Sequence, residues 1–147
     1  MTGPITIIVN GEAVAKGRPR MTRKGFVYTP AAIRKYEAHA RLAAGLAMAD
    51  RPPLQGPVRL ELLVELPVPA SWSKGKRAAA IVGGILLTSR PDLDNFIKSA
   101  LDAINTIVVV DDSQVVEMRS RKKYGGQPKL IVTVHPLDGA ASHGRSP

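Results

Sequence analysis

Two segments of this chain have the residue spacing of α-helices, while its other patterned segments have the composition of β-strands. Residues 31–49 are rich in Ala and Leu and follow Pro30, and proline is favoured in the first turn of a helix. A second helix is expected to begin at Asp94 or Asn95 and to end near Asn105, because apolar residues recur there at i, i+4 and i+7. The fold must therefore combine two main helices with several short strands.

The expected strands come in runs and do not alternate regularly with the helices. They are a strand pair or a bent strand around Asn10-Gly11, a short strand at 26–28, a strand at 56–68, one at 107–110 before an acidic turn, and two final strands joined across Gly125-Gly126. This order predicts an α+β domain with a mixed or antiparallel sheet. The 147 residues suffice for one small domain, expected over 1–136, with a disordered tail at 137–147.

The excess of basic residues restricts the classes of partner. Lys and Arg number 21 against 12 Asp and Glu, for a formal net charge of +9. Such a chain favours a polyanion, nucleic acid before an anionic membrane surface, with simple solubility as the alternative. The longest nearly apolar run, AAAIVGGILL, is far shorter than the roughly 18 residues of a membrane span. Because cysteine is also absent, which is typical of a reducing compartment, we expect a cytoplasmic protein without a membrane partner.

The basic residues gather in three parts of the sequence. The interval from Lys16 to Lys35 contains no acidic residue, a second basic segment follows Trp72, and a third follows the acidic turn. Trp72 could stack on a base, although a single Trp beside prolines is more often a packing anchor. Each basic segment alone could be a solvated face, but together they predict a DNA-binding surface. The predicted DNA-binding residues are Lys16, Arg18, Arg20, Arg23, Lys24, Lys74, Lys76, Arg77, Arg119, Arg121, Lys122 and Lys123.

The stretch RPDLDNFIKSALDAIN places two carboxylates one residue apart where the second helix begins. Asp92 and Asp94 stand at i and i+2 of an extended segment, so both side chains can point to one spot. The ordinary explanation is that one of them caps the helix and the other is a solvated loop residue. Lys98 follows one helical turn after Asp94, where its ammonium can project over the same face or form a surface pair with that carboxylate.

A second acidic pair, Asp111 and Asp112, follows the apolar run IVVV. A turn would explain one of the two. If this strand packs beside the second helix, one member can reach Asp92 and Asp94, and three converging carboxylates repel one another unless a cation lies between them. All-oxygen ligands select Mg²⁺ or Mn²⁺, whereas Zn²⁺ prefers His or Cys. An acidic cluster with a basic surface is the composition of a metal-dependent nuclease.

The blocks RPDLDNFIKSALDAIN and VVVDDSQVVEMRSRKKY resemble the RusA-type Holliday junction resolvases of bacteria and their prophages. The early VAKGRPRMTRKGFVYTPAAIRKYE and the SWSKGKR segment are similar to the phage-type branch of this family. The resemblance implies a small homodimeric, Mg²⁺-dependent endonuclease that resolves four-way DNA junctions by paired, symmetric nicks in recombination and repair. It also implies an enzyme of the bacterial cell, of host, phage or prophage origin.

The same resemblance assigns roles to individual residues. Asp92, Asp94 and Asp112 match the family's catalytic, metal-binding aspartates, which would hold one or two Mg²⁺ ions, with Mn²⁺ as the alternative. Lys98 matches the family's catalytic lysine and would act on the scissile phosphate or the attacking water. Asp111 is a weaker candidate ligand.

Two other functions stay open at this point. In a non-catalytic nucleic-acid-binding module the acids would be caps and turns, and the basic segments would account for binding. A metal-dependent phosphohydrolase of small nucleotides is disfavoured, because the positive charge is spread over more of the chain than a small pocket would use.

Overall fold

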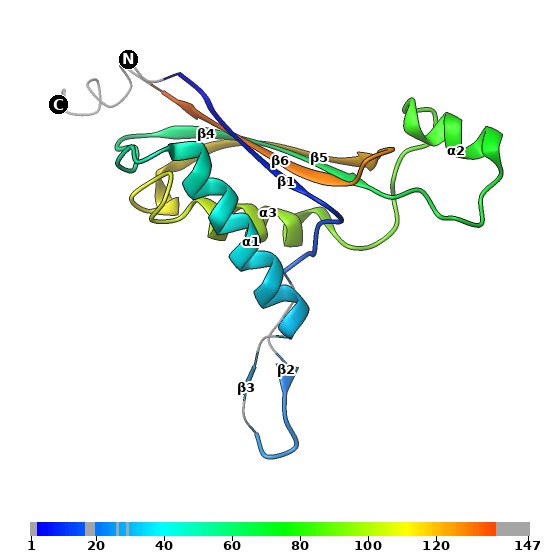
Figure 1. Cartoon of the computed structure of the whole chain (residues 1–147), viewed down its shortest axis with the longest axis horizontal. Helices are drawn as coiled ribbons and strands as arrows, with labels where there is room; N and C mark the ends of the chain where they lie inside the picture. The colour runs from blue at the N-terminus through cyan, green and yellow to red at the C-terminus, as the bar shows by residue number, and fades with distance from the viewer. Residues whose placement is uncertain (1–2, 17–19, 26, 29, 138–147) are drawn as a thin grey trace.

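The computed structural model describes residues 3–16, 20–25, 27–28 and 30–137 (Figure 1). In chain order the elements are β1 (Ile5–Asn10), β2 (Arg20–Met21), β3 (Val27–Tyr28), α1 (Ala31–Met48), β4 (Val58–Leu66), α2 (Lys74–Ile81), α3 (Leu93–Ile104), the 3₁₀ turn η1 (Asp112–Gln114), β5 (Val115–Tyr124) and β6 (Lys129–Pro136). Arg18, the side chain of Arg20 and all but the first residue of the predicted tail lie outside the described part, so the proposed domain limits stay a prediction.

The main sheet has four strands in the order β1-β6-β4-β5, and it is mixed. Strands β4 and β5 run parallel, whereas β6 is antiparallel to both of its neighbours. Parallel neighbours need a long crossover, and the segment that carries α2 and α3 supplies it. The predicted α+β domain with a mixed sheet is confirmed.

Helices α1 and α3 cover one face of this sheet (Figure 1). Along β1 and β4 every second residue is buried against them, as a half-covered strand requires. Phe96 on α3 is fully buried between the layers. Its replacement by Ala would cost roughly 3–5 kcal/mol of stability, the usual cost of truncating a core aromatic residue. The acidic start of α3 is therefore carried by a helix that the core holds in place.

The connection from β5 to β6 passes over the end of β4. The predicted junction at Gly125-Gly126 is present, but the two strands that it joins are not neighbours, because β4 lies between them. Gly125 donates its N–H to the carbonyl of Leu66 at 3.0 Å. A Cβ atom on Gly125 would lie 2.8 Å from the Cβ of Glu65, so this crossing requires glycine.

Two local predictions need correction. The chain does not form a hairpin at Asn10-Gly11, because β1 pairs with β6 and the Gly11 N–H donates to the carbonyl of Pro128. The expected strand at 107–110 is a turn with isolated bridges, in which Val108 and Val109 are buried and close the end of the core. The basic segment after Trp72 forms α2.

None of the helices in the described ranges is long and apolar enough to cross a membrane.

Candidate active site

Asp92 and Asp94 lie at the N-terminal end of α3, as the sequence predicts. Asp92 occupies the N-cap position with an extended backbone, and Asp94 lies in the first turn. Asp92 makes no capping hydrogen bond with its side chain. Both side chains are exposed. The ordinary explanation of the pair, in which the first carboxylate caps the helix, therefore does not describe this structure.

Lys122 fixes the loop that leads into these carboxylates. Its Nζ donates to the backbone carbonyls of Ser89 at 2.7 Å and of Pro91 at 3.0 Å. Lys122 is on β5, on the sheet face that α3 covers, so this ammonium links the sheet to the residue before Asp92. Lys122 therefore supports this loop, and the DNA contact that the sequence predicts for it stays a prediction.

The segment after β1 holds the same helix from the other flank. The Lys16 N–H donates to the Ser99 hydroxyl at 3.1 Å, and that hydroxyl lies 3.3 Å from the carbonyl of Val14. The Lys16 ammonium pairs with Asp102 and, at 3.5 Å, with Glu37 of α1. The hydrogen bond to Asp102, with the nearby acidic charges, raises the pKa of Lys16 above its usual value. Lys16 therefore ties the segment after β1 to α1 and α3, and the DNA contact predicted for it stays a prediction.

A hollow of about 470 Å³ opens beside Asp92. Arg90, Pro91 and Asn95 line it from one side, and Glu12 with the following residues 13–15 lines it from the other. The sequence reasoning did not single out Glu12 or Arg90. The sequence hinted at Arg90 only through its position two residues before Asp92. Glu12 is far from Asp92 in the sequence, and the two come together only in the folded chain.

Lys98 lies one turn beyond Asp94 on the outward face of α3, and both are exposed. No salt bridge joins Asp94 to Lys98 or to any other residue in the described ranges. Both charges are therefore available to an external group rather than to each other.

Asp111 and Asp112 differ in what they do. The Asp111 carboxylate accepts the N–H of Ser113 at 2.9 Å, and Gln114 accepts the N–H of Asp111 in return, so the two form a capping box. The hydrogen bond from Ser113 holds the pKa of Asp111 below its usual value. The Asp112 side chain is half-buried and has no hydrogen bond or ion pair with another described residue. Its backbone is held at both groups, because the N–H donates to Asn105 Oδ1 at 3.0 Å and the carbonyl accepts the N–H of Val115. Asp111 is thus the structural member of the pair.

The two acidic groups lie at opposite ends of α3. Asp92 and Asp94 mark its beginning, whereas Asn105, which holds Asp112, is its C-cap. A helix of 12 residues is about 18 Å long at 1.5 Å per residue. Among the described residues, no group of three or more His, Cys, Asp or Glu is arranged to hold a metal ion. One chain therefore does not gather the three predicted aspartates, and their joint role stays a prediction.

The basic segment around Trp72 has structural contacts of its own. The ring of Trp72 packs edge-on against Tyr124 with 5.3 Å between centroids, and the Lys76 ammonium lies 4.0 Å from the Trp72 ring centre. Arg77 donates to the carbonyl of Pro69 at 3.0 Å. The packing-anchor interpretation of Trp72 fits these contacts. Lys74, at the start of α2, is exposed.

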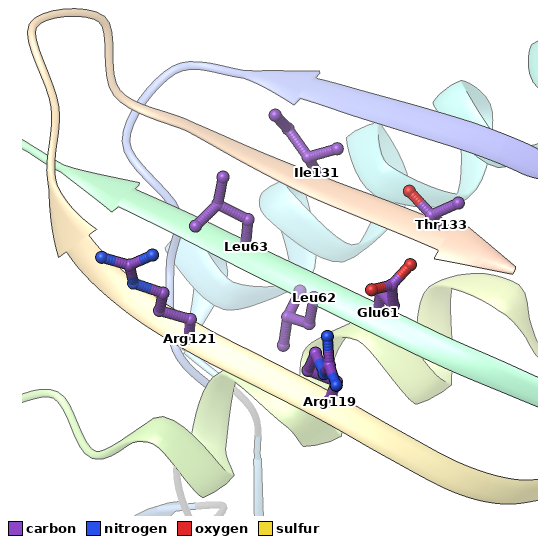
Figure 2. Close-up of a pocket in the computed structure, with 7 residues that line it drawn as sticks. All are labelled: Glu61, Leu62, Leu63, Arg119, Arg121, Ile131 and Thr133. Atoms are coloured by element: carbon purple, nitrogen blue, oxygen red, sulfur yellow. The ribbon is translucent and has the colours of Figure 1, made fainter.

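Arg119 and Arg121 are on the opposite side of the sheet from the helices. Figure 2 shows both side chains projecting from β5 on the uncovered face, with the helices behind the sheet. In register, Arg119 stands opposite Glu61 and Arg121 opposite Leu63. Together with Leu62, Ile131 and Thr133 they line a shallow hollow. These two arginines therefore do not lie on the same face as Lys122, although all three were predicted as one cluster.

Two other predicted DNA-binding residues lie on a separate hairpin. Strands β2 and β3 pair with each other and extend away from the body of the fold (Figure 1). Arg23 and Lys24 occupy the turn between them, and both are exposed. Gly25 completes the turn with a φ of +86°, a conformation that favours glycine.

Comparison with known proteins agrees with the acidic motifs. A family model described as Endodeoxyribonuclease RusA matches residues 10–135, which include both acidic segments. The protein named Uncharacterized protein YqaN, of Bacillus subtilis (strain 168), is 36% identical over 140 residues, which are 90% of this chain and 96% of that protein. The similarity thus extends over nearly the whole chain.

Proposed function

This chain belongs to the RusA family of endodeoxyribonucleases, and we propose that it resolves Holliday junctions by paired, symmetric nicks that depend on a divalent metal ion. Membership establishes a DNA-cleaving enzyme of recombination. The metal, the paired nicks and the roles of single residues are the proposal.

The observation that carries the proposal is the state of Asp92 and Asp94. Both carboxylates are exposed, stand at the start of a rigid helix and have no capping hydrogen bond or salt bridge with a described residue. Mg²⁺ is commonly held by one or two carboxylates together with water and a substrate phosphate, so this pair fits such an ion. The chemistry that a bound Mg²⁺ supplies in nucleases is activation of water and neutralisation of the leaving oxygen.

We place the third carboxylate, Asp112, in the second protomer of a homodimer. Within one chain α3 separates Asp112 from Asp92 and Asp94 by about 18 Å, the length of a 12-residue helix. A two-fold axis that crosses α3 near its middle would place the C-terminal end of one α3 beside the N-terminal end of the other. Each dimer would then have two complete sites, which is what paired nicks require.

Two basic side chains are suited to the phosphate. Lys98 projects from the same outward face as Asp94 and would stabilise charge on the scissile phosphate. Arg90 lines the hollow beside Asp92 and would bind a neighbouring phosphate through its planar fork of donors. Both residues would act by position, because a fixed donor near the reacting group needs no rearrangement during cleavage.

Contacts to the rest of the DNA are assigned to the exposed basic residues. Arg23 and Lys24 extend on the β2–β3 hairpin, and a two-stranded ribbon has the width to enter a DNA groove. Lys74 lies at the exposed start of α2. Lys16, Arg77 and Lys122 are left out of this set, because each already makes described contacts within the chain.

The first test is cleavage of a synthetic four-way junction beside a linear duplex of the same sequence, with Mg²⁺ and with EDTA. We expect symmetric nicks on the junction and none on the duplex. EDTA and Asp94→Asn should each abolish the nicks, and the Asp94→Asn protein should still bind the junction. Asp102→Asn is the matched control, since it removes a carboxylate from the same helix away from the site. Tight binding without nicks under any metal would instead support a non-catalytic binding module.

The second test asks where the third carboxylate comes from. Asp94→Asn and Asp112→Asn proteins, each inactive alone, are co-expressed with different tags so that mixed dimers can be purified. In a mixed dimer one site receives both substitutions and the other receives neither. A site shared between protomers therefore predicts recovery of single nicks in the mixed dimer. A site built within one chain predicts no recovery, because every site would then carry one substitution.

A further inference from the structure

The connection that follows α2 exposes a small apolar surface. Val82 is 82% exposed and Leu86 is 73% exposed, whereas Ala80 and Leu87 on either side of this segment are buried. Single exposed apolar residues are common on protein surfaces, but several that gather in one place usually mark a binding site. The segment 81–86 is called the apolar tip below.

The apolar tip has a defined backbone conformation. Gly84 donates its N–H to the carbonyl of Ala79 at 2.7 Å, and Gly83, which has a φ of +91°, donates to the carbonyl of Ala80 at 3.1 Å. These are the two hydrogen bonds of a Schellman motif, in which the residue after the left-handed position often makes an apolar contact with the helix. That residue is Gly84, which has no side chain. The exposure of Val82 is therefore a property of a folded turn.

The apolar tip lies at the end of the sheet where β5 ends, apart from α1 and α3 (Figure 1). It borders a narrow hollow of about 80 Å³. Apolar side chains of the tip and basic side chains of β5 line this hollow together, namely Ile81, Val82, Leu86, Arg121, Lys122 and Lys123. The tip thus combines an apolar surface with neighbouring cations.

The sequence around the tip is basic as well. Between Pro67 and Pro91 there is no acidic residue, and the basic residues are Lys74, Lys76, Arg77 and Arg90. A basic surface favours a polyanion. Because the chain belongs to a family of endodeoxyribonucleases, that polyanion is DNA. The apolar side chains then indicate which part of the DNA this surface fits.

The apolar surface that DNA offers to an aliphatic side chain is mainly the flat face of a base pair. In a continuous duplex the next base pair covers this face, and an apolar wedge must separate the two pairs to reach it, at a cost in stacking energy. At the branch point of a four-way junction the stacking is interrupted. A side chain that covers a base pair there displaces less stacking than it would in a linear duplex.

The length of chain between the tip and the acidic site limits how far the tip lies from the nick. Asp92 follows Leu86 by six residues, which span at most about 20–22 Å. At about 3.4 Å per base pair, this distance corresponds to about six base pairs. Lys122, which lines the hollow at the tip, also binds the carbonyls of Ser89 and Pro91. One lysine thus connects the tip to the loop before Asp92.

From these observations we infer that Val82 and Leu86 insert against an exposed base pair at the branch point of the junction, while Arg121 and Lys123 bind the flanking phosphates. The apolar tip would make branched DNA bind more tightly than linear duplex and would set the distance from the branch point to Asp92. This inference rests on the proposed function for its substrate. It goes beyond that function by assigning recognition of the branch to residues outside the acidic site.

The first test measures binding and unstacking in EDTA, where metal-dependent cleavage is suppressed. The four-way junction carries 2-aminopurine beside the branch point, and the emission of this base rises when its neighbour no longer stacks on it. The wild-type protein should raise the emission. Val82→Ser combined with Leu86→Ser should abolish this rise and weaken junction binding by about tenfold, the order expected for the loss of two partly buried aliphatic side chains. Binding to linear duplex should not change.

The matched control removes two similarly exposed leucines from α1. Leu42→Ser combined with Leu46→Ser should bind the junction and raise the 2-aminopurine emission as the wild type does. Circular dichroism and the fluorescence of Trp72 check that each variant is folded.

A variant with a larger apolar side chain tests the chemistry of the contact. Leu86→Phe should keep the preference for the junction and the rise in emission, because an aromatic ring covers a base at least as well as leucine does. If Leu86→Phe loses the preference as fully as the serine variant does, covering a base is not what the tip contributes, and the inference fails.

Two results with the serine variant would overturn the inference. An unchanged preference for the junction, with an unchanged rise in emission, would mean that the tip does not touch the branch point. A change of oligomeric state in sedimentation equilibrium would mean that Val82 and Leu86 are covered by another copy of the chain.

These outcomes are separable from the catalytic proposal. If the tip effects are present in EDTA but no metal ion supports nicks, the inference stands and the proposed activity fails. If the serine variant binds and nicks the junction as well as the wild type does, the nuclease stands and the inference fails.

Discussion

The Lys122 ammonium lies 3.0 Å from the carbonyl oxygen of Pro91, so an edge strand of the sheet directly holds the residue that precedes Asp92. The same ammonium also binds the carbonyl of Ser89. A lysine in a basic cluster thus positions the predicted metal-binding loop, and the position of Asp92 depends on a contact 30 residues away in sequence.

This contact predicts a catalytic defect that is not a binding defect. Lys122→Met removes both hydrogen bonds and keeps the apolar stem, so the loop before Asp92 loses its anchor. We expect cleavage of a bound junction to slow by about tenfold to a hundredfold, since small displacements of catalytic groups have effects of this order. The measurement is single-turnover cleavage at saturating enzyme. Lys123→Met, one residue along and without this contact, is the control: loss of its predicted DNA contact would weaken binding, but a saturated junction should still be cleaved nearly normally.

Lys16 is expected to affect stability rather than DNA affinity. Lys16→Met should lower the free energy of unfolding by about 0.5–1 kcal/mol, the upper range for a partly exposed ion pair. Because the folded pKa of Lys16 is raised, its contribution is present below the ordinary pKa of 10.5 and is lost as the pH rises through the folded value. The difference between wild type and variant in urea unfolding should therefore be full at pH 8 and should shrink as the pH is raised above 10.5. Asp102→Asn removes the main partner of Lys16, so it should lower the free energy of unfolding at pH 8 by a similar amount.

The acidic pair after α3 predicts two separable phenotypes. Asp111→Ala should lower the melting temperature, because it removes the capping hydrogen bond to Ser113, while some cleavage is retained. Asp112→Asn should abolish cleavage with little change in melting temperature. The lowered pKa of Asp111 means that its stabilising effect is present above the ordinary carboxyl pKa of 3.8 and is lost as the pH falls through the folded value. Loss of all cleavage in Asp111→Ala at full folding would make Asp111 the ligand instead.

The hairpin residues predict a change in the salt dependence of binding. Arg23→Ala and Lys24→Ala should each reduce the slope of log K against log salt by about 1, as expected for one lost phosphate contact. Lys16→Ala should leave that slope unchanged, because its charge is already paired within the chain. Junction binding measured from about 50 to 200 mM salt separates the two groups. If the slopes of all three variants equal that of the wild type, Arg23 and Lys24 do not contact DNA.

The helices were predictable because helix formation depends on residues that are close together in the sequence. The Ala-rich segment at 31–48 has high intrinsic helix propensity, and α3 begins within one or two residues of its predicted start. The run at 107–110 was misassigned because four apolar residues fit a buried turn as well as a strand. The arrangement in which β4 separates β5 from β6 depends on long-range pairing, which composition does not encode.

The candidate site was also only partly predictable, because some of its contacts join residues that are far apart in the sequence. The sequence identified the carboxylates at 92, 94, 111 and 112, because the two members of each pair stand close together beside a predicted helix or strand. It did not place Asp112 at the far end of α3, since that depends on the hydrogen bond of its N–H to Asn105. It also counted Lys16 as free, because Asp102 is 86 residues away and becomes a partner only in the fold.

The packing of Trp72 on Tyr124 gives this chain an internal optical probe. It is the single tryptophan, it lies at the end of β5 near the Lys122 anchor, and Lys76 lies over its ring. Its fluorescence therefore reports the docking of α2 against β5, while far-ultraviolet circular dichroism reports the whole fold. A change in emission on adding junction DNA, without a change in circular dichroism, would reveal movement of this end of the sheet in solution with no label attached.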